Sequence, residues 1–229
     1  MTEKAQAPQP GRFIVLEGID GSGTTTQVAL LVDRLRQRGL SARGTREPSD
    51  GPIGTMLRQA LTGRLGVPGG GAPGWATMAL LFAADRVDHV EADIAPFVRA
   101  GGVIVSDRYD ASSVAYQSVA SRTGRAGGSA AEAAETVAWI RALNQRARRP
   151  DLTIVLSVPP ELAATRRETR GDAAQLYEKE EMQRALAAFY ADLERHMPGD
   201  RIAMIDGTGA VDAVHARVAE AAFAVLDPR

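Results

Sequence analysis

The chain contains no cysteine, which excludes disulfides, thiolate metal ligands and a thiol nucleophile. Lysine is nearly absent, since Lys4 and Lys179 are the only lysines among 27 basic residues. No apolar run approaches the roughly 20 residues that cross a bilayer. The net charge of −1 gives no overall attraction to nucleic acid or to anionic membranes. We therefore expect a cytoplasmic protein that binds neither nucleic acid nor a membrane.

A glycine-rich loop follows the first apolar run, at residues 13–16, and leads into a helical pattern that begins near Thr25. Strand, glycine-rich loop and helix in this order are typical of a P-loop, G-x-x-x-x-G-K-[ST]. An ordinary strand-to-helix connection is the alternative, but three glycines and two hydroxyls fit the pattern. Such a loop holds phosphate through converging backbone N–H groups and the helix N-terminus. The expected nucleotide-binding residues are Gly18, Ile19, Asp20, Gly21, Ser22, Gly23, Thr24, Thr25 and Thr26.

Thr24 stands where the P-loop pattern has lysine. A lysine there would bring a mobile positive charge to the transferring phosphate, whereas threonine brings only a hydroxyl. The loop can still hold an anion, so the sequence predicts a phosphate site that lacks its usual cation.

Apolar runs at residues 13–16, 102–106, 152–158 and 202–205, with a weaker one at 41–45, predict five strands. Strands that are apolar throughout and alternate with helices indicate an α/β fold, a parallel sheet with helices on both faces. We expect a single domain over residues 11–229, after a flexible tail at residues 1–10. Helical patterns cover residues 27–38, 52–61, 75–99, 131–146, 179–196 and 211–226.

Polar motifs follow the carboxyl ends of the predicted strands, where parallel sheets bind ligands. Asp107 ends one strand beside the P-loop, and an acid at such a position commonly holds Mg²⁺ together with the loop hydroxyl, here Thr25. Capping of the next helix is the alternative role for Asp107. Arg108 offers a fork of donors for phosphate. Arg46 ends another strand and fits either the ligand crevice or a surface ion pair.

Phe82 and Arg86 lie one helical turn apart within residues 75–99. A ring and a guanidinium on one face can stack on a base and bond its edge. Core packing is the commoner role of a phenylalanine at helical spacing, so this pair needs support from other motifs.

That support is a resemblance that covers residues 11 to about 226. The motifs at residues 17–23, 45–48, 80–86, 107–117 and 150–153 stand in the order and at the spacing of thymidylate kinases, and the chain resembles that family. The resemblance implies a P-loop nucleoside monophosphate kinase-like fold. It also implies transfer of the ATP γ-phosphate to dTMP with Mg²⁺, giving dTDP for dTTP synthesis. Family members commonly form homodimers through helices, and residues 75–90 are the candidate face.

The resemblance also implies individual roles. Asp20 would face the acceptor sugar and phosphate, and Arg46 and Arg108 would hold the dTMP phosphate. Phe82 would stack on thymine and Arg86 would bond its edge. The nucleoside side would be lined by Ser113, Tyr116 and Gln117, with Tyr116 crowding a 2′-hydroxyl.

The chain departs from the family at three places that concern the phosphates. Thr24 replaces the loop lysine, Gly21 leaves no arginine in the loop, and Leu176 stands where the family's lid has an arginine. Residues 166–181 resemble that lid, and we expect Arg166 or Arg170 to supply the catalytic charge, with Lys179 as second choice. A nucleotide-binding protein with impaired catalysis, or a kinase for another nucleotide, remains the alternative.

Overall fold

The computed structural model describes residues 11–66, 71, 73–122, 129–170 and 180–226. Within them the chain forms one parallel sheet in the order β2-β3-β1-β4-β5, which confirms the expected fold class. The predicted tail at residues 1–10 lies outside the described part. The strands are β1 (Arg12–Glu17), β2 (Ala42–Arg46), β3 (Val103–Asp107), β4 (Leu152–Ser157) and β5 (Ile202–Asp206).

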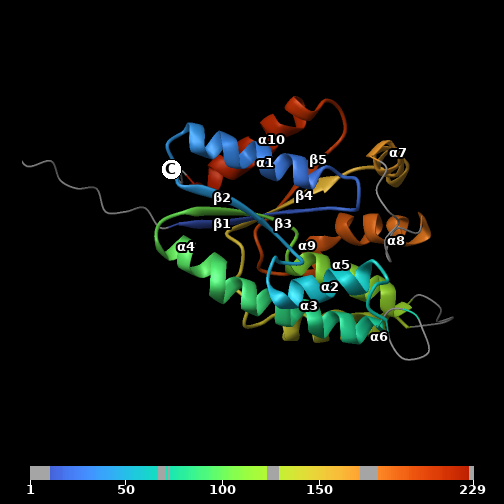
Figure 1. Ribbon diagram of the computed structural model, residues 1–229. Coiled ribbons are helices and arrows are strands. Elements are labelled where there is room, and N and C mark those ends of the chain that lie inside the picture. Colours follow the sequence, from blue (N-terminus) through green and yellow to red (C-terminus); the bar gives the residue numbers. More distant parts are fainter. Residues whose placement is uncertain (1–10, 67–70, 72, 123–128, 171–179, 227–229) are drawn as a thin grey trace, which may run out of the picture.

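Helices cover both faces of the sheet because successive strand residues point to opposite sides (Figure 1). Ile14 and Leu16 of β1 pack toward α1 (Thr24–Gln37) and α10 (Val211–Leu226). Phe13 and Val15 pack on the other side, with apolar residues of η1 (Val90–Ile94) and α4 (Ala95–Arg99). The second face is completed by α3 (Trp75–His89), α5 (Asp110–Arg122), α6 (Ala130–Leu143), α8 (Glu180–Ala191) and α9 (Leu193–His196), and α2 (Pro52–Leu61) packs on α3.

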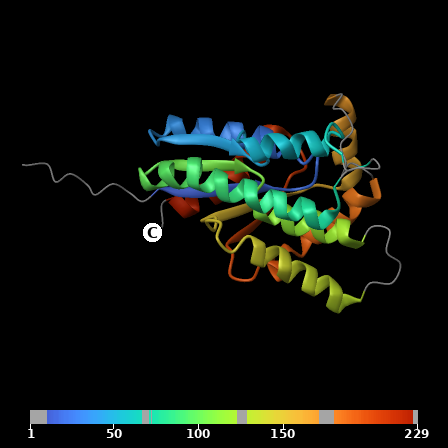
Figure 2. The same ribbon diagram turned by 60° about the horizontal axis from the view of Figure 1, so that its bottom comes forward.

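The carboxyl ends of the strands meet at one end of the molecule, where α7 (Pro160–Arg170) also lies (Figures 1 and 2). Parallel sheets bind ligands at this end. None of the described helices has the length and apolar character that a membrane span requires.

The helices differ from the expectations at five places. The predicted helix at 75–99 is continuous, but it contains the π turn η1 shortly before Pro96, whose ring nitrogen has no hydrogen to donate. Residues 180–196 form two helices, α8 and α9, and α6 ends at Leu143 instead of 146. The helical patterns expected from the sequence also did not include α5 and α7.

Candidate active site

The P-loop connects β1 to α1 and owes its shape to glycine. Gly18, Gly21 and Gly23 have φ of 156°, 91° and 100°, and the last two values lie in the left-handed region that side chains disfavour. Thr24 opens α1 and is buried, and the first turn of α1 has no acidic residue. The loop therefore ends at the N–H groups of the α1 N-terminus, which carry partial positive charge. Because no acidic side chain in that turn offsets this charge, the loop is suited to bind an anion.

Helix α7 lies directly against this loop. A Cβ at Gly21 would stand 2.3 Å from the carbonyl oxygen of Ala163, so the loop backbone touches the helix backbone. Arg166 Nη1 donates to the Ser22 carbonyl at 3.3 Å, and Arg167 Nη1 donates to the Asp20 carbonyl. These contacts join the loop and α7 into one wall of the site.

Asp107 and Thr25 meet at the foot of the loop. Thr25 Oγ1 donates to Asp107 Oδ2 at 2.5 Å. Asp107 Oδ1 is buried and has no hydrogen-bond partner among the described residues. An unshared carboxylate oxygen beside a hydroxyl is the donor set that Mg²⁺ accepts, with phosphate and water oxygens completing its coordination. No cluster of three or more His, Asp or Glu side chains suited to a metal occurs in the described ranges.

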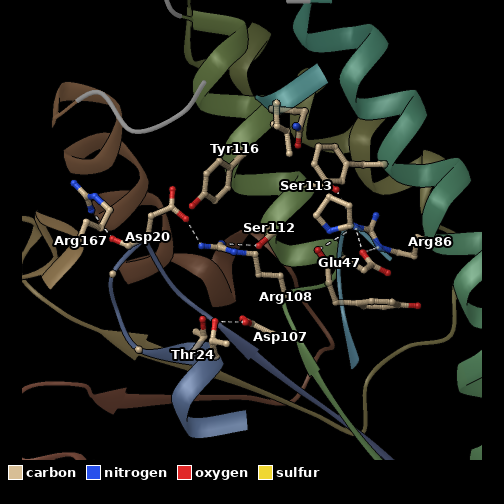
Figure 3. A pocket seen from close by; sticks show the side chains of 18 residues that line it. Asp20, Thr24, Glu47, Arg86, Asp107, Arg108, Ser112, Ser113, Tyr116 and Arg167 are labelled. Carbon is tan, nitrogen blue, oxygen red and sulfur yellow. Dashed lines mark hydrogen bonds and ion pairs between the residues drawn. The ribbon is translucent and has the colours of Figure 1, made fainter. Parts of the chain in front are cut away.

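Arg108 begins the connection from β3 to α5 and is held in a strained backbone conformation. Its φ is 71°, which costs a non-glycine residue about 1–3 kcal/mol. The guanidinium donates to the Gly18 carbonyl at 3.0 Å and to Asp20 Oδ1 at 2.5 Å. It also lies 5.1 Å from the Tyr116 ring centre. The strain therefore places a positive charge over the P-loop (Figure 3).

Asp20 is also held by helix α8. Gln183 is fully buried, and its Nε2 donates to Asp20 Oδ2 at 2.9 Å. The Asp20 N–H donates to Gln183 Oε1 at 3.2 Å. Together with the Arg167 contact, these bonds connect Asp20 to both α7 and α8.

Glu17 is a buried carboxyl beneath the site. Burial raises its pKa to about 7, although Arg108 and several hydrogen bonds act to lower it. The Tyr109 and Ser112 N–H groups donate to Oε1 at 2.9 and 3.0 Å, and the hydroxyls of Ser112 and Tyr190 donate to Oε2 at 2.6 and 3.0 Å. Glu17 thereby fixes the first turn of α5, which carries several residues of the site.

Arg86 on α3 forms a second buried cluster. Its Nε and Nη2 donate to Glu47 Oε2 at 2.9 and 2.6 Å, and both side chains are almost fully buried. Arg86 Nη2 also donates to Ser113 Oγ at 3.0 Å, and Nη1 donates to Asn144 Oδ1. A buried charge needs such partners, and they fix the direction in which the guanidinium points.

These clusters surround a pocket of about 260 Å³, here called the central pocket. The Gln117 amide, 1% exposed, reaches its wall with neither polar atom hydrogen-bonded to the described residues. A buried amide in this state has donor and acceptor atoms that a ligand or a water molecule can satisfy. Residues expected at the site that line the central pocket are Asp20, Gly21, Gly23, Thr24, Thr25, Phe82, Arg86, Asp107, Arg108, Ser113, Tyr116 and Gln117.

A second pocket, the outer groove, lies on the other side of the P-loop and measures about 460 Å³. It shares Gly21 and Gly23 with the central pocket. The remaining lining residues are Ser22, Thr26, Gln27, Thr165, Arg166, Thr169, Gly207, Gly209, Ala210, Val211 and Val214.

Three expected residues, Arg46, Gly18 and Ile19, line neither pocket, and the side chains of two more, Arg170 and Lys179, are not described. Arg46 is exposed and bonds Asp50 at 2.7 Å, the surface ion pair that the sequence left open. Gly18 presents its carbonyl to Arg108, and Ile19 packs in the core. Arg170 ends α7, and nothing is described of its side chain. Lys179 lies outside the described residues, as does most of the lid predicted at 166–181.

The sequence patterns missed several residues that shape the site. Glu47 follows Arg46 in the same motif and could have been noticed there, and Glu17 ends a buried strand, where a carboxyl is unusual. No local signal identifies Gln183, because its contacts with Asp20 span more than 160 residues. Arg167 lines the central pocket, whereas Arg166 lines the outer groove.

Comparisons with known proteins agree with this geometry. A probable thymidylate kinase of Pyrococcus abyssi is 36% identical over 205 residues, which cover 90% of this chain and 92% of that protein. A probable thymidylate kinase of Thermococcus kodakarensis is 36% identical over 208 residues, 90% of this chain and 94% of that protein. A thymidylate kinase of Xanthomonas campestris pv. campestris is 37% identical over 205 residues, 89% and 79% of the two chains. The family model described as Thymidylate kinase matches residues 16–218, and the chain therefore belongs to the thymidylate kinase family.

Proposed function

We propose that this protein is a thymidylate kinase, which transfers the γ-phosphoryl group of ATP to dTMP and releases dTDP and ADP. The observation that carries the proposal is the central pocket. It brings a P-loop, an acid with a free oxygen and the Arg108 guanidinium together with Phe82, Arg86 and Gln117. Each of these parts suits one portion of a nucleotide, and membership in the thymidylate kinase family identifies dTMP as the expected acceptor.

The acceptor occupies the central pocket in this proposal. The Arg108 guanidinium holds the dTMP phosphate, and Arg46 reaches the same phosphate when it releases Asp50. Phe82 stacks on thymine, and Arg86, already aimed by Glu47, bonds the base edge. Ser113, Tyr116 and Gln117 line the nucleoside side, and the Tyr116 ring leaves no room for a 2′-hydroxyl.

The donor lies along the P-loop, with its phosphates on the N–H groups of residues 18–26 and its nucleoside in the outer groove. Arg166 contributes positive charge to that groove. The two pockets share Gly21 and Gly23, so donor and acceptor phosphates meet where the pockets join.

The reaction needs positioning and charge neutralisation more than proton transfer. An oxygen of the dTMP phosphate attacks the γ-phosphorus. The bond from that phosphorus to the β–γ bridging oxygen breaks, and its electron pair stays on ADP. Arg108 neutralises the attacking phosphate, and Asp20 orients Arg108 through their 2.5 Å contact. The lid and α7 arginines Arg166, Arg167 and Arg170 are the candidates that neutralise the transferred group.

A magnesium ion fits the same proposal. Thr25 Oγ1 and Asp107 would hold it, and the free Asp107 Oδ1 is the observation that supports this pairing. When bound, the ion supplies positive charge to the donor phosphates.

We further propose one catalytic domain over residues 11–229 that works as a cytoplasmic homodimer. The exposed Leu80 and Ala84 on α3 offer an apolar strip for the second copy, and Leu80 is 51% exposed. Size-exclusion chromatography with light scattering tests the dimer, since a monomer at micromolar concentration contradicts it.

The catalytic proposal has one direct test. Purified protein is incubated with ATP, Mg²⁺ and each nucleoside monophosphate in turn, and ADP is measured. We expect rapid ADP formation with dTMP and little with the others. Nucleotide binding without turnover would favour a nucleotide-binding protein whose catalysis is impaired by Thr24. Preference for another acceptor would favour a related kinase.

A further inference from the structure

Arg166 and Arg167 are neighbours on α7, but their side chains serve different pockets. Successive residues of a helix point about 100° apart, because a turn takes 3.6 residues. Arg166 lines the outer groove, and Arg167 lines the central pocket. The P-loop therefore lies between two arginines of one helix.

Arg166 is held by the protein. Its Nη1 donates to the Ser22 carbonyl at 3.3 Å and its Nη2 to the Gly207 carbonyl at 3.1 Å. These bonds point its nitrogens at backbone on both sides of the outer groove. Arg166 thus joins the loop to the segment after β5.

Arg167 makes fewer hydrogen bonds than Arg166 within the described residues. Its one hydrogen bond within the described ranges goes from Nη1 to the Asp20 carbonyl, and no carboxylate of those ranges pairs with it. A guanidinium has five N–H donors, and the other four of Arg167 have no hydrogen-bond partner among the described residues. Figure 3 shows Arg167 on the opposite side of Asp20 from Arg108.

Among the described residues three cations line the central pocket, and two of them form ion pairs with carboxylates. Arg86 pairs with Glu47, and Arg108 pairs with Asp20. Arg167 is the third, and it shares the wall with Thr24, whose hydroxyl carries no charge. The P-loop thus has no cation at position 24, but Arg167 of α7 places a cation on the same pocket wall.

The position of Arg167 is fixed by backbone contact. The Ala163 carbonyl would lie 2.3 Å from a Cβ at Gly21, one turn before Arg167 on the same helix. Gly21 belongs to both pockets, so α7 touches the loop at the place where the pockets join. Arg167, one turn further along the helix, is therefore anchored close to the place where the pockets join.

We propose that Arg167 supplies the transferred phosphoryl group with the positive charge that a P-loop lysine at position 24 would provide. The proposal rests on the kinase function proposed above and assigns one residue within it. A guanidinium suits this task because its fork of donors matches two phosphate oxygens. The Asp20 carbonyl holds the Arg167 guanidinium in position. The guanidinium is therefore oriented before the reaction, whereas a lysine would move with the phosphate.

The test is a cycle of substitutions in the full chain, assayed with ATP, Mg²⁺ and dTMP. We expect Arg167→Ala to lower kcat about 100-fold or more, the usual effect of removing one transition-state donor, with little change in KM for dTMP. Adding Thr24→Lys to that variant restores kcat by about tenfold or more, because the charge returns at the neighbouring position. Thr24→Lys in the unaltered chain gives a smaller gain.

Two controls separate this role from a structural one. Arg195→Ala removes an arginine with an 81% exposed side chain on α9 and leaves kcat unchanged. Thermal unfolding and dTMP calorimetry show whether Arg167→Ala is folded and binds the acceptor. If Arg167 only held the Asp20 carbonyl, a lysine at position 24 would not restore turnover, so failed rescue overturns the proposal.

The remaining outcomes are also decisive. Unchanged kcat for Arg167→Ala, in an unaltered chain that does turn over dTMP, overturns this inference alone. Absence of turnover by the unaltered chain overturns the proposed kinase function and this inference with it.

Discussion

The contact between the P-loop and α7 makes a quantitative prediction about two glycines. Gly21 and Gly23 have nearly the same φ, 91° and 100°, so alanine at either position meets the same conformational penalty of about 1–2 kcal/mol. Their surroundings differ, because a Cβ at Gly21 lies 2.3 Å from the Ala163 carbonyl oxygen, whereas a Cβ at Gly23 has nothing within 4 Å. Forcing an atom into packed backbone costs about 1–3 kcal/mol.

Gly21→Ala should therefore destabilise the ligand-free protein by about 1–3 kcal/mol more than Gly23→Ala. For a chain of this size the difference corresponds to about 2–12 °C in Tm. Urea unfolding and thermal melts of the two variants measure it without reference to activity. Equal losses would refute the inferred contact, and a larger loss for Gly23→Ala would reverse the assignment of the two glycines.

Two further predictions concern carboxyl groups. Because burial raises the pKa of Glu17 from 4.5 to about 7, the folded chain holds more protons than the unfolded chain between those pH values, and stability falls as pH rises through them. The unfolding free energy of Glu17→Gln, measured in urea relative to that of the unaltered chain, should rise by roughly 3 kcal/mol between pH 4.5 and about pH 8. A free-energy difference that does not change with pH would contradict the raised pKa. Asp107→Asn should raise the Mg²⁺ concentration for half-maximal activity about tenfold or more, while Asp33→Asn on the exposed side of α1 leaves it unchanged; equal Mg²⁺ dependence would exclude Asp107 as the metal acid.

The sheet could be predicted because strands buried on both faces are apolar throughout. β1, β3 and β4 are almost wholly buried and were recognised as plain apolar runs. β2 gave the weak pattern because polar residues occupy its half-buried and exposed positions, with Arg43 and Thr45 half buried and Arg46 exposed. β5 lies at the other edge and is also partly exposed, but its residues are apolar from Ile202 to Ile205, so it was still recognised. Composition, more than position in the sheet, therefore decides which strands can be predicted.

The missed helices lack the pattern by which helices are recognised. α5 is buried nearly all round, from Asp110 and Ala111 to Ser118 and Val119, so no polar face alternates with an apolar one. α7 has the opposite composition, with arginines and glutamates over most of its length and Ala163 fully buried. Residues from 166 onward were expected to form a lid by resemblance, whereas the described part of α7 packs on the P-loop through Ala163.

The lining of the central pocket could be anticipated where residues are neighbours in a motif, as Asp107 and Arg108 are. It could not be anticipated where helix phase decides which way a side chain points. Arg166 and Arg167 are equivalent by composition, and only the orientation of α7 sends the second into the central pocket. Gln183 could not be found either, because its partner Asp20 is distant in sequence.

The bonds from Asp20 to Arg167 and Gln183 have a consequence for how the site responds to mutation. Asp20 accepts a bond from α7 at its carbonyl, and it exchanges two bonds with Gln183 of α8. The same carboxylate accepts a bond from Arg108. A substitution on α7 or α8 that displaces Asp20 therefore also displaces the Arg108 guanidinium, so residues far from the central pocket can change its charge.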